Sequence, residues 1–336
     1  MEPSTDRVFS VTLDDVVAAR ERIAGSLRRT PVLRTSIDTI DGPVDVVFKL
    51  EYLQAGGCFK PRGSLNAVRH ARDEELLDDA GVLVASGGNA AIGAAWAARI
   101  AATRCTVVVP ETAPQVKVDS LRALGAEVHH VGDRYQHAAD AAAEMAKRSG
   151  ALLLHAYDQP DIVAGAGTIG LELADDIDGP LTTVVCVGGG GLLGGLTAVQ
   201  RPGDRIVGAE PAGSSCLHQA LEAGHPVSVE LDSVAADSLG ATRLGDVCWS
   251  TIAGRAVTSV VVSDPELIAA RRHLWDAFRI LVEPGTATAV AAVLTGAVRP
   301  EPDSTLCVVL CGANTTWYVG GQRLVHPAGN RGANLA

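Results

Sequence analysis

Lysine, aromatic residues and long apolar runs are all scarce in this 336-residue sequence. No apolar stretch reaches the roughly 20 residues that span a bilayer, so a membrane protein is not expected. The first 15 residues lack a basic region followed by an apolar core, which argues against a secretory signal and for a cytoplasmic protein. The net charge of -11 argues against nucleic-acid binding, because neutralising phosphates requires a basic surface.

Cysteine is present, but without the patterns of a cross-linked or zinc-binding protein. The seven cysteines are odd in number, scattered along the chain and never spaced as C-x-x-C. We therefore expect neither a disulfide framework nor a metal site, and we interpret most of them as small buried hydrophobes.

The sequence is long for a single hydrophobic core, and strand-like segments alternate with helix-like ones. Its 47% hydrophobic and 20% charged residues are typical of a globular protein, and its length favours two lobes. Strands are predicted at 44–50, 82–85, 105–109, 127–131, 152–155, 184–187, 205–210, 259–262 and 306–310, and helices at 12–28, from about 61, at 116–124 and at 138–148. This alternation predicts an α/β fold in which each lobe is a mostly parallel twisted sheet flanked by helices.

A run of four glycines follows one of the predicted buried strands. Gly188–Gly191 separate the strand from Leu192 and a predicted helix. Glycine amides can approach an anion closely, and a helix N-terminus adds free N–H donors and its dipole. The segment lacks the Lys and Ser/Thr of a P-loop, so it indicates a site for one phosphate group more than a nucleotide site. A flexible turn is the alternative.

Lys60 stands between Phe59 and Pro61 at a predicted helix start. The chain has only four lysines, and most basic positions are filled by arginine. A helix N-terminus and the neighbouring Arg62 both disfavour a second positive charge, and a lysine with a lowered pKa can form an imine with an aldehyde cofactor. The segment alone favours an ordinary solvated lysine.

Two other predicted strand ends carry polar or reactive groups. Ser86 and Asn89 flank a glycine turn before a predicted helix, which suits either a carboxylate site or an ordinary helix N-cap. Cys311 lies at the carboxyl end of a predicted strand, where ligands of open α/β sheets bind. A core cysteine is the alternative for that position.

Together these segments resemble the threonine and serine dehydratases, which are pyridoxal-phosphate enzymes with the tryptophan-synthase β-subunit type of fold (fold type II). The similarity covers nearly the whole chain and is carried by Arg29–Leu33, Lys49–Glu51, Gly57–Gly63, Ser86–Asn89, Leu124–Val128, Ala164–Thr168, Gly188–Gly191, Glu283–Pro284 and Leu310–Gly312. It implies a large cofactor-binding domain of residues 1–70 and 156–336, a small domain of 71–155, and pyridoxal 5′-phosphate in the cleft between them. A homodimer is the default assembly.

The resemblance also implies a role for each segment. Lys60 forms a Schiff base with the cofactor and later removes the Cα proton as a general base. The other implied cofactor contacts are Phe59, Asn89 at the ring hydroxyl, Gly188, Gly189, Gly190, Gly191 and Leu192 at the phosphate, and Cys311 at the pyridine nitrogen. The implied substrate contacts are Ser86, Gly87, Asn89 and Ala90. Loss of hydroxide from Cβ, protonated by the cofactor phosphate, then leads L-threonine or L-serine to a 2-oxo acid and ammonia.

Four positions bear on which member of this family the chain resembles. A neutral thiol at Cys311 lets the ring nitrogen stay unprotonated, which favours loss of a β leaving group over transamination. Cys58 stands where relatives usually have Ser, and Ala90 where many threonine dehydratases have His. In serine racemases a serine at the position of Gly87 is the acid on the opposite face of the substrate, so racemisation is disfavoured.

Ser238 and two glutamates complete the comparison with relatives. Ser238 replaces a glycine that is common in racemases. Relatives bind a divalent cation near a glutamate that follows a strand, as Glu210 does, but the next acidic ligand is missing near Cys216. We therefore expect no metal and interpret Glu210 as a structural carboxylate at a helix entry. Glu283 is also interpreted as structural, with a place near the cofactor ring as the alternative.

Several alternatives to a dehydratase stay open. A β-replacement enzyme would be expected to show Lys-Asp-Arg and Ser-Gly-Asn-Thr, where this chain has Lys60-Pro61-Arg62 and Asn89-Ala90. A serine racemase is opposed by Gly87, and a non-catalytic phosphate-ligand binder would not need Lys60. The chain ends soon after the last predicted strand, so neither a regulatory domain nor isoleucine inhibition is expected. Single pocket residues set the choice among threonine, serine and other β-hydroxy amino acids, and the sequence does not reveal it.

Overall fold

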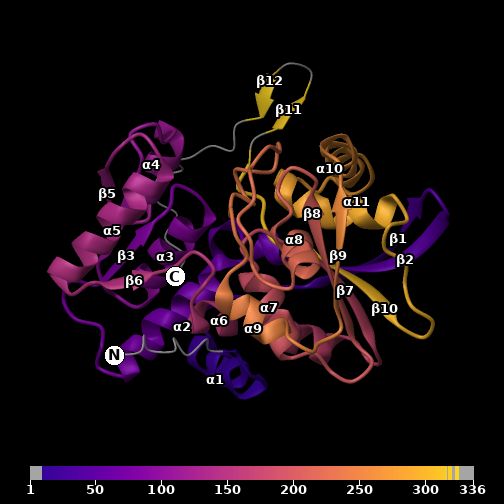
Figure 1. Ribbon diagram of the computed structural model, residues 1–336, viewed down its shortest axis with the longest axis horizontal. Helices are drawn as coiled ribbons and strands as arrows, with labels where there is room; N and C mark the ends of the chain where they lie inside the picture. Colours follow the sequence, from indigo (N-terminus) through magenta and orange to yellow (C-terminus); the bar gives the residue numbers. More distant parts are fainter. Residues whose placement is uncertain (1–9, 316, 320–321, 325–336) are drawn as a thin grey trace, which may run out of the picture.

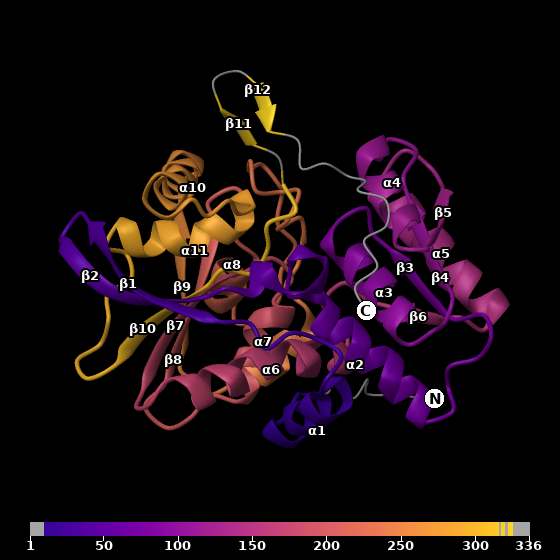
Figure 2. The same ribbon diagram turned by 180° about the vertical axis from the view of Figure 1, so that it is seen from behind.

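The computed structural model describes residues 10–315, 317–319 and 322–324, and its strands form two large sheets and a small hairpin (Figure 1). The hairpin pairs β11 (Trp317–Val319) with β12 (Gln322–Leu324). The two large sheets lie in separate lobes, side by side in both views (Figures 1 and 2). The predicted α/β class, with helices flanking a sheet in each lobe, is therefore confirmed.

The larger sheet is mostly parallel. Its order is β1-β2-β10-β7-β8-β9, and within it only β1 and β2 pair antiparallel. The strands are β1 (Val32–Thr39), β2 (Gly42–Lys49), β7 (Leu181–Cys186), β8 (Arg205–Pro211), β9 (Val257–Val262) and β10 (Thr305–Val309). Every residue of the central strand β7 is buried, as expected for a parallel strand that helices cover on both faces.

The helices of this lobe lie on both faces of its sheet (Figure 2). They are α1 (Leu13–Ile23), α6 (Pro160–Asp176), α7 (Gly191–Ala198), α8 (Cys216–Ala223), α9 (Asp246–Ile252), α10 (Asp264–Phe278) and α11 (Pro284–Leu294). Helix α11 packs on β7 and β8 with α10 outside it, whereas α7 covers the opposite face together with α6 and α9. One large hydrophobic cluster fills the space between the sheet and the helices on each of its faces. It includes Cys186 and Val187, which precede the glycine loop.

The smaller sheet is entirely parallel, in the order β5-β4-β3-β6. Its elements are β3 (Val82–Ala85), α3 (Asn89–Ile100), β4 (Cys105–Val109), α4 (Gln115–Ala123), β5 (Glu127–His130), α5 (Tyr135–Ser149) and β6 (Leu152–Leu154). Alternate residues of β3 enter different clusters, because side chains of a strand point to opposite faces. Val82 and Val84 pack with the alanines of α3, and Leu83 packs with those of α5.

Helix α2 (Lys60–Asp73) lies between the lobes and follows the short 3-10 turns η1 (Glu51–Leu53) and η2 (Ala55–Gly57). It packs against α3 on one side and α6 on the other. A Cβ added at Gly63 would lie 2.5 Å from the carbonyl oxygen of Ile162, and one at Gly165 would lie 2.5 Å from that of Arg62. Glycines thus let the backbones of α2 and α6 approach closely, which fixes the start of α2.

A buried ionic cluster also anchors the first turn of α2. The Arg62 side chain is 2% exposed, and its guanidinium donates to Glu51 at 2.8 and 2.9 Å and to Glu172 at 2.7 Å. Lys49 Nζ donates to the other carboxylate oxygen of Glu172 at 2.7 Å. Burial lowers the pKa of Arg62, but the two carboxylates outweigh it and raise that pKa overall. Lys60 is therefore two residues from a strongly fixed side chain.

Two local predictions differ from the structure. The helix predicted over 12–28 ends at Ile23, because the chain turns at Gly25, which has φ 69°. Strand β1 was not predicted; it is a sheet-edge strand whose one buried residue is Ile37, so its apolar pattern is weak. The limits of the large and small domains, 1–70 with 156–336 and 71–155, stay a prediction. No helix within the described ranges is long and apolar enough to cross a membrane.

Candidate active site

Lys60 begins α2 at the boundary between the lobes. Its Nζ donates to the carbonyl oxygen of Ala156 at 2.7 Å and lies 4.9 Å from the centroid of the Phe59 ring. Burial lowers the pKa of Lys60. The electrostatic influence of the nearby Cys58 and Cys311 acts in the opposite direction but does not reverse the shift. A lowered pKa raises the fraction of neutral amine, which is the nucleophilic form.

The segment His155–Asp158, called here the crossover segment, links Lys60 to the glycine loop. It leads from β6 in the smaller sheet to α6 in the larger lobe. The Ala156 carbonyl oxygen accepts a hydrogen bond from the Lys60 amine. The ring of Tyr157 packs on Gly189, and a Cβ added at Gly189 would lie 2.3 Å from that ring. Asp158 accepts the backbone N–H of Val247 at 2.9 Å, near the start of α9. Lys60 and the glycine loop thus contact two consecutive residues, Ala156 and Tyr157 respectively.

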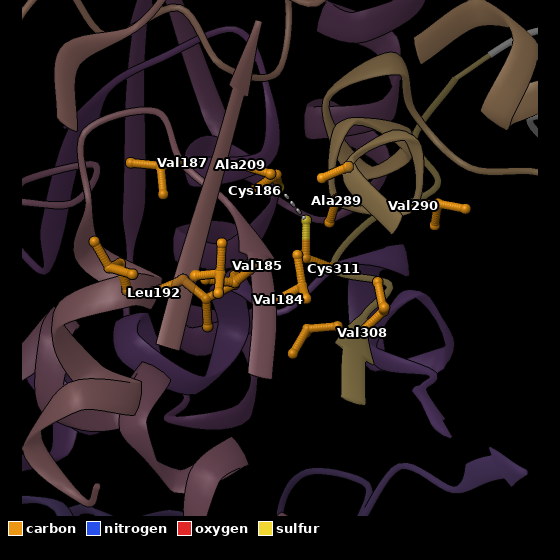
Figure 3. Close-up of a cluster of buried hydrophobic side chains, with 14 of the residues drawn as sticks. Val184, Val185, Cys186, Val187, Leu192, Ala209, Ala289, Val290, Val308 and Cys311 are labelled. Atoms are coloured by element: carbon orange, nitrogen blue, oxygen red, sulfur yellow. Dashed lines mark hydrogen bonds between the residues drawn. The ribbon is translucent and has the colours of Figure 1, made fainter. Parts of the chain in front are cut away.

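The glycine loop joins β7 to α7, as predicted. Gly190 has φ 86°, a region that favours glycine. A Cβ at Gly190 would lie 2.5 Å from Cys248 Sγ, and one at Gly191 would lie 2.9 Å from the Tyr157 carbonyl oxygen. No side chain therefore fits at either position. Leu192 is 4% exposed and its side chain packs in the core (Figure 3), so an anion could contact it only through its backbone.

The predicted carboxylate turn lies against Lys60 from the other lobe. Ser86 Oγ accepts the backbone N–H of Gly88 at 3.1 Å, and Asn89 is the first residue of α3. One turn later, a Cβ added at Gly93 would lie 2.8 Å from Lys60 Cβ. The helix that carries Asn89 therefore packs directly on the first residue of α2.

Asn89 is held by two residues from the larger lobe. Its Nδ2 lies 2.9 Å from each carboxylate oxygen of Glu283, and its Oδ1 accepts from Asn314 Nδ2 at 2.7 Å. Glu283 also accepts the backbone N–H of Asn314 at 3.0 Å. Burial raises the pKa of Glu283, and these hydrogen bonds oppose the shift. Glu283 thus orients Asn89 through a contact between the lobes.

Gly87 and Ala90 flank this turn and carry no polar group. A Cβ at Gly87 would be 3.8 Å from Val109 Cγ1, an ordinary contact distance, so a small side chain fits there. Beside the turn, Lys117 of α4 forms an ion pair with Asp237 of the larger lobe. This pair joins the lobes at the rim of the site.

Cys311 lies two residues beyond β10, between the Lys60 region and β7. Its carbonyl oxygen accepts the backbone N–H of Phe59 at 3.0 Å. Its Sγ lies 3.3 Å from Cys186 Sγ and 3.1 Å from Thr286 Oγ1, and Figure 3 shows the two sulfurs facing each other. Cys58, next to Phe59, is also buried, and burial raises the pKa of its thiol. The predicted strand-end cysteine is therefore tied to the same region as Lys60.

Glu210 and Ser238 cap helices. Glu210 accepts the backbone N–H groups of Leu217 and His218 at 2.7 and 2.8 Å, at the start of α8. Burial nevertheless raises the pKa of Glu210 to about 7. Ser238 Oγ accepts the backbone N–H of Gly285 at 3.2 Å, in the first turn of α11. Both residues thus have structural partners in the larger lobe.

Comparison with known proteins places this geometry in a family. Residues 23–312 match the family of pyridoxal-phosphate dependent enzymes. A serine racemase of Arabidopsis thaliana is 33% identical over 94% of this chain and 96% of its own length. A beta-hydroxyaspartate dehydratase of Paracoccus denitrificans is 33% identical over 85% of this chain and 91% of its own length. A solved threonine deaminase from T.th. superposes with a TM-score of 0.80 at 32% identity, covering 92% of this chain and 100% of that one.

The chain therefore belongs to the pyridoxal-phosphate dependent enzymes, and its cofactor is pyridoxal phosphate. The residues present suit that group. The glycine loop has no room for a Cβ at Gly189, Gly190 or Gly191 and leads into a helix N-terminus, whose free N–H groups suit a phosphate. The Lys60 amine, with its lowered pKa, suits an aldehyde.

The site also contains residues that the sequence did not single out. They are Ala156, Tyr157, Thr286, Asn314 and the strand residue Cys186. Ala156 contributes a backbone carbonyl, which leaves no signature in a sequence. Tyr157 and Asn314 could have been suspected only as polar residues a few positions beyond predicted strands.

Proposed function

We propose that this chain is a lyase that removes water from L-threonine or L-serine and yields a 2-oxo acid and ammonia. One observation carries the proposal. The Lys60 amine donates to Ala156 at 2.7 Å, and the next residue, Tyr157, packs on Gly189. In the proposed site, the reactive amine and the phosphate-binding loop form two sides, and Asn89 on α3 forms a third.

The bound cofactor would supply an electron sink for negative charge that develops at Cα. In this proposal Lys60 holds the cofactor aldehyde, and its free amine later takes the Cα proton. The backbone at Gly188, Gly189, Gly190, Gly191 and Leu192 holds the phosphate. Phe59 would lie beside the ring, Asn89 would bond the ring hydroxyl, and the neutral thiol of Cys311 would face the pyridine nitrogen.

The substrate is held by the turn that precedes α3. Ser86, with its hydroxyl, and the backbone N–H groups at the helix start around Asn89 and Ala90 suit a carboxylate. Holding the carboxylate and the amine fixes the Cα–H bond relative to Lys60, which is how positioning accelerates proton removal. Gly87 leaves open space beside the substrate and offers no proton.

Elimination of a β-hydroxyl is favoured over the other reactions of the family. Two of the proteins compared above, a dehydratase and a deaminase, carry names of such reactions. The similarity to a serine racemase is as strong, but the residue at position 87 here has no hydroxyl that could protonate the opposite face of the substrate. We infer the two-domain division given above, a cleft between the domains and a cytoplasmic homodimer as the setting of this reaction.

The direct test is an ammonia-release assay with added cofactor over a panel of amino acids. We expect release from threonine or serine, with a matching 2-oxo acid, and loss of both products in Lys60→Ala. Lys147→Ala, which removes an exposed lysine, is the matched control and should keep full activity. Turnover only in the presence of an added thiol or sulfide would instead establish β-replacement chemistry. Interconversion of serine enantiomers without ammonia would establish a racemase.

A further inference from the structure

Cys186 and Cys311 form the closest contact between cysteine sulfurs in the hydrogen-bond network of the described chain. Their sulfurs are 3.3 Å apart, nearer than two sulfurs in simple van der Waals contact. All seven cysteines are free and buried, so the pair is reduced in this structure. Figure 3 shows Cys311 pointing towards Cys186 among apolar side chains that include Val184 and Ala289.

The backbone positions of the pair are compatible with a disulfide. Cys186 ends β7, and Cys311 follows its parallel neighbour β10, whose last pairing with β7 is Val308 with Val184. The two cysteines are thus offset by one residue along neighbouring strands. With strands about 4.8 Å apart and a rise of about 3.3 Å per residue, their Cα atoms should be about 6 Å apart. Disulfides usually join Cα atoms about 4.4–6.8 Å apart, so a bond requires little backbone movement.

The position of the pair gives the bond a consequence. Cys311 is bound through its carbonyl to Phe59, next to Lys60, and only Val187 separates Cys186 from the glycine loop. A bond between the two would draw the Cys311 sulfur towards β7 and away from the region of Lys60. It would also restrain the strand end from which the loop begins. The disulfide would therefore alter the protein both near Lys60, which holds the cofactor aldehyde in the proposed function, and at the start of the glycine loop, which holds its phosphate.

We propose that Cys186 and Cys311 are a redox modification site, which peroxide converts to a disulfide that weakens cofactor binding. This goes beyond the proposed reaction and requires no particular substrate. In a reducing compartment such a bond would be transient and reversible by thiols.

The chemistry balances with hydrogen peroxide as the oxidant. Cys311, on the side of the cofactor site, attacks one peroxide oxygen, so that an S–O bond forms and the O–O bond breaks. This gives a sulfenic acid, and the released oxygen leaves as water with the thiol proton. The Cys186 sulfur then attacks the sulfenic sulfur, the S–S bond forms, and the S–O bond breaks to release a second water. Two thiols are oxidised and one peroxide is reduced.

The surroundings of the two cysteines favour oxidation of Cys311 first and reaction of Cys186 second. The hydrogen bond to Cys311 and burial both raise the pKa of Cys186, which keeps its proton on the sulfur. Thr286 Oγ1 donates to the carbonyl oxygen of Gly312 at 2.9 Å, so it is available to Cys311 as an acceptor. Cys186 can therefore donate to Cys311 until Cys311 has been oxidised, and then it resolves the sulfenic acid.

The test treats the purified holoenzyme with hydrogen peroxide and maps its peptides by mass spectrometry without reduction. We expect a linked pair of peptides containing Cys186 and Cys311, and release of cofactor followed by its absorbance after filtration. A thiol reductant should remove the link and restore cofactor binding. The apparent cofactor dissociation constant of the oxidised protein should rise about tenfold or more, since a buried contact is displaced.

Two variants separate this pair from general oxidation. Cys186→Ser keeps the size and a hydrogen-bonding group, and it should neither form the link nor release cofactor on treatment. Cys105→Ser removes a buried cysteine of the smaller sheet and should behave as the unaltered protein does. The proposal is overturned if peroxide oxidises other cysteines while these two stay reduced, or if Cys186→Ser loses cofactor as fast as the unaltered protein. If Cys186→Ser does not fold, the peptide map of the unaltered protein decides alone.

Discussion

Glu283 accepts hydrogen bonds from Asn89 across the boundary between the lobes, with Asn89 Nδ2 2.9 Å from each carboxylate oxygen. Glu283 immediately precedes α11 and Asn89 begins α3, so this contact joins one helix start in each lobe. The same carboxylate accepts the backbone N–H of Asn314. In the proposed site, where Asn89 meets the ring hydroxyl, Glu283 determines which way the Asn89 amide faces.

Glu283→Gln should therefore impair catalysis while leaving the protein folded. The glutamine amide has a single acceptor oxygen and would present its own N–H groups to Asn89 and Asn314. Losing one hydrogen bond to a charged group costs about 1.5–3 kcal/mol, so kcat should fall about tenfold or more. Steady-state kinetics with serine or threonine measure this, and the absorption band of bound cofactor should shift. Kinetics and spectrum identical to those of the unaltered enzyme would contradict the role of Glu283.

The pH profile gives a second readout of Glu283. Burial raises the pKa of Glu283, so this carboxyl gains its proton at a higher pH than a free glutamate does. Once protonated, it can no longer accept from Asn89 and Asn314 together. The activity of the unaltered enzyme should thus fall as pH drops through this raised pKa, and Glu283→Gln should lack that acidic limb. An unchanged acidic limb in the variant would assign it to another group.

Removing Glu172 should destabilise the protein strongly. Glu172 pairs with both Lys49 and Arg62, which are almost fully buried. Glu172→Leu would remove one carboxylate from each of these buried cations, leaving Arg62 paired with Glu51 and Lys49 with Asp176 at 3.7 Å. Breaking a buried pair in this way costs about 3–5 kcal/mol. Urea unfolding measures the loss. The matched control is Asp41→Ala, which breaks the exposed pair with Arg299 and should cost less than about 1 kcal/mol. Equal effects of the two changes would contradict the anchoring role of the cluster.

Glu210 should make stability decline as pH rises. Its folded pKa of about 7 exceeds the ordinary value of 4.5, so its contribution is fully present below 4.5 and is lost as pH rises through 7. The full difference is roughly 3 kcal/mol. We expect the free energy of unfolding of Glu210→Gln, measured at pH 5, 6, 7 and 8, to rise relative to that of the unaltered protein as pH rises.

Glu266 provides the opposite case for the same experiment. It is an exposed carboxylate at the start of α10, where hydrogen bonds from Ser263 lower its pKa. Its contribution is therefore present above the ordinary pKa and is lost as pH falls through the lowered one. At neutral pH, Glu266→Gln should therefore be less stable to unfolding than the unaltered protein. A similar pH trend in both variants would mean that burial is not what distinguishes Glu210.

Gly87→Ser should introduce racemisation. A Cβ at this position meets only Val109 at 3.8 Å, so the serine fits without displacing backbone. Its hydroxyl would supply the proton that the resemblance to serine racemases assigns to this position. Chiral chromatography of L-serine reactions should then detect D-serine. Gly87→Ala adds the same bulk without a hydroxyl and should form none. D-Serine from both variants, or from neither while elimination persists, would contradict this explanation.

The main outline of the fold could be predicted from the sequence because its strands carry strong local signals. The buried runs at β3, β4 and β7, and the glycines that follow β3 and β7, indicate parallel units without any knowledge of packing. Strand β1 could not be found in this way, because an edge strand with one buried residue has little apolar periodicity. The end of α1 depends on the positive φ of Gly25, which a helical pattern does not reveal.

The site was predictable only where the residue type itself limits the chemistry. Lys60, Asn89 and the glycine loop have residue types that limit their roles, and the structure brings them together. The carbonyl of Ala156 and the facing of Cys186 towards Cys311 depend on tertiary placement. The contact of Glu283 with Asn89 joins residues 194 positions apart in the sequence. Long-range pairings of this kind leave no local pattern.

The central claim is that Lys60 holds the cofactor, and reduction with borohydride tests it most directly. Reduction makes the bond between the cofactor and its lysine permanent, and peptide mass spectrometry then locates the added mass. The chain has four lysines, of which Lys49 and Lys117 are ion-paired, whereas Lys60 donates to a neutral carbonyl. We predict the label on the peptide containing Lys60 and nowhere else. A label on Lys49, Lys117 or Lys147, or a cofactor that stays unattached, would contradict the account.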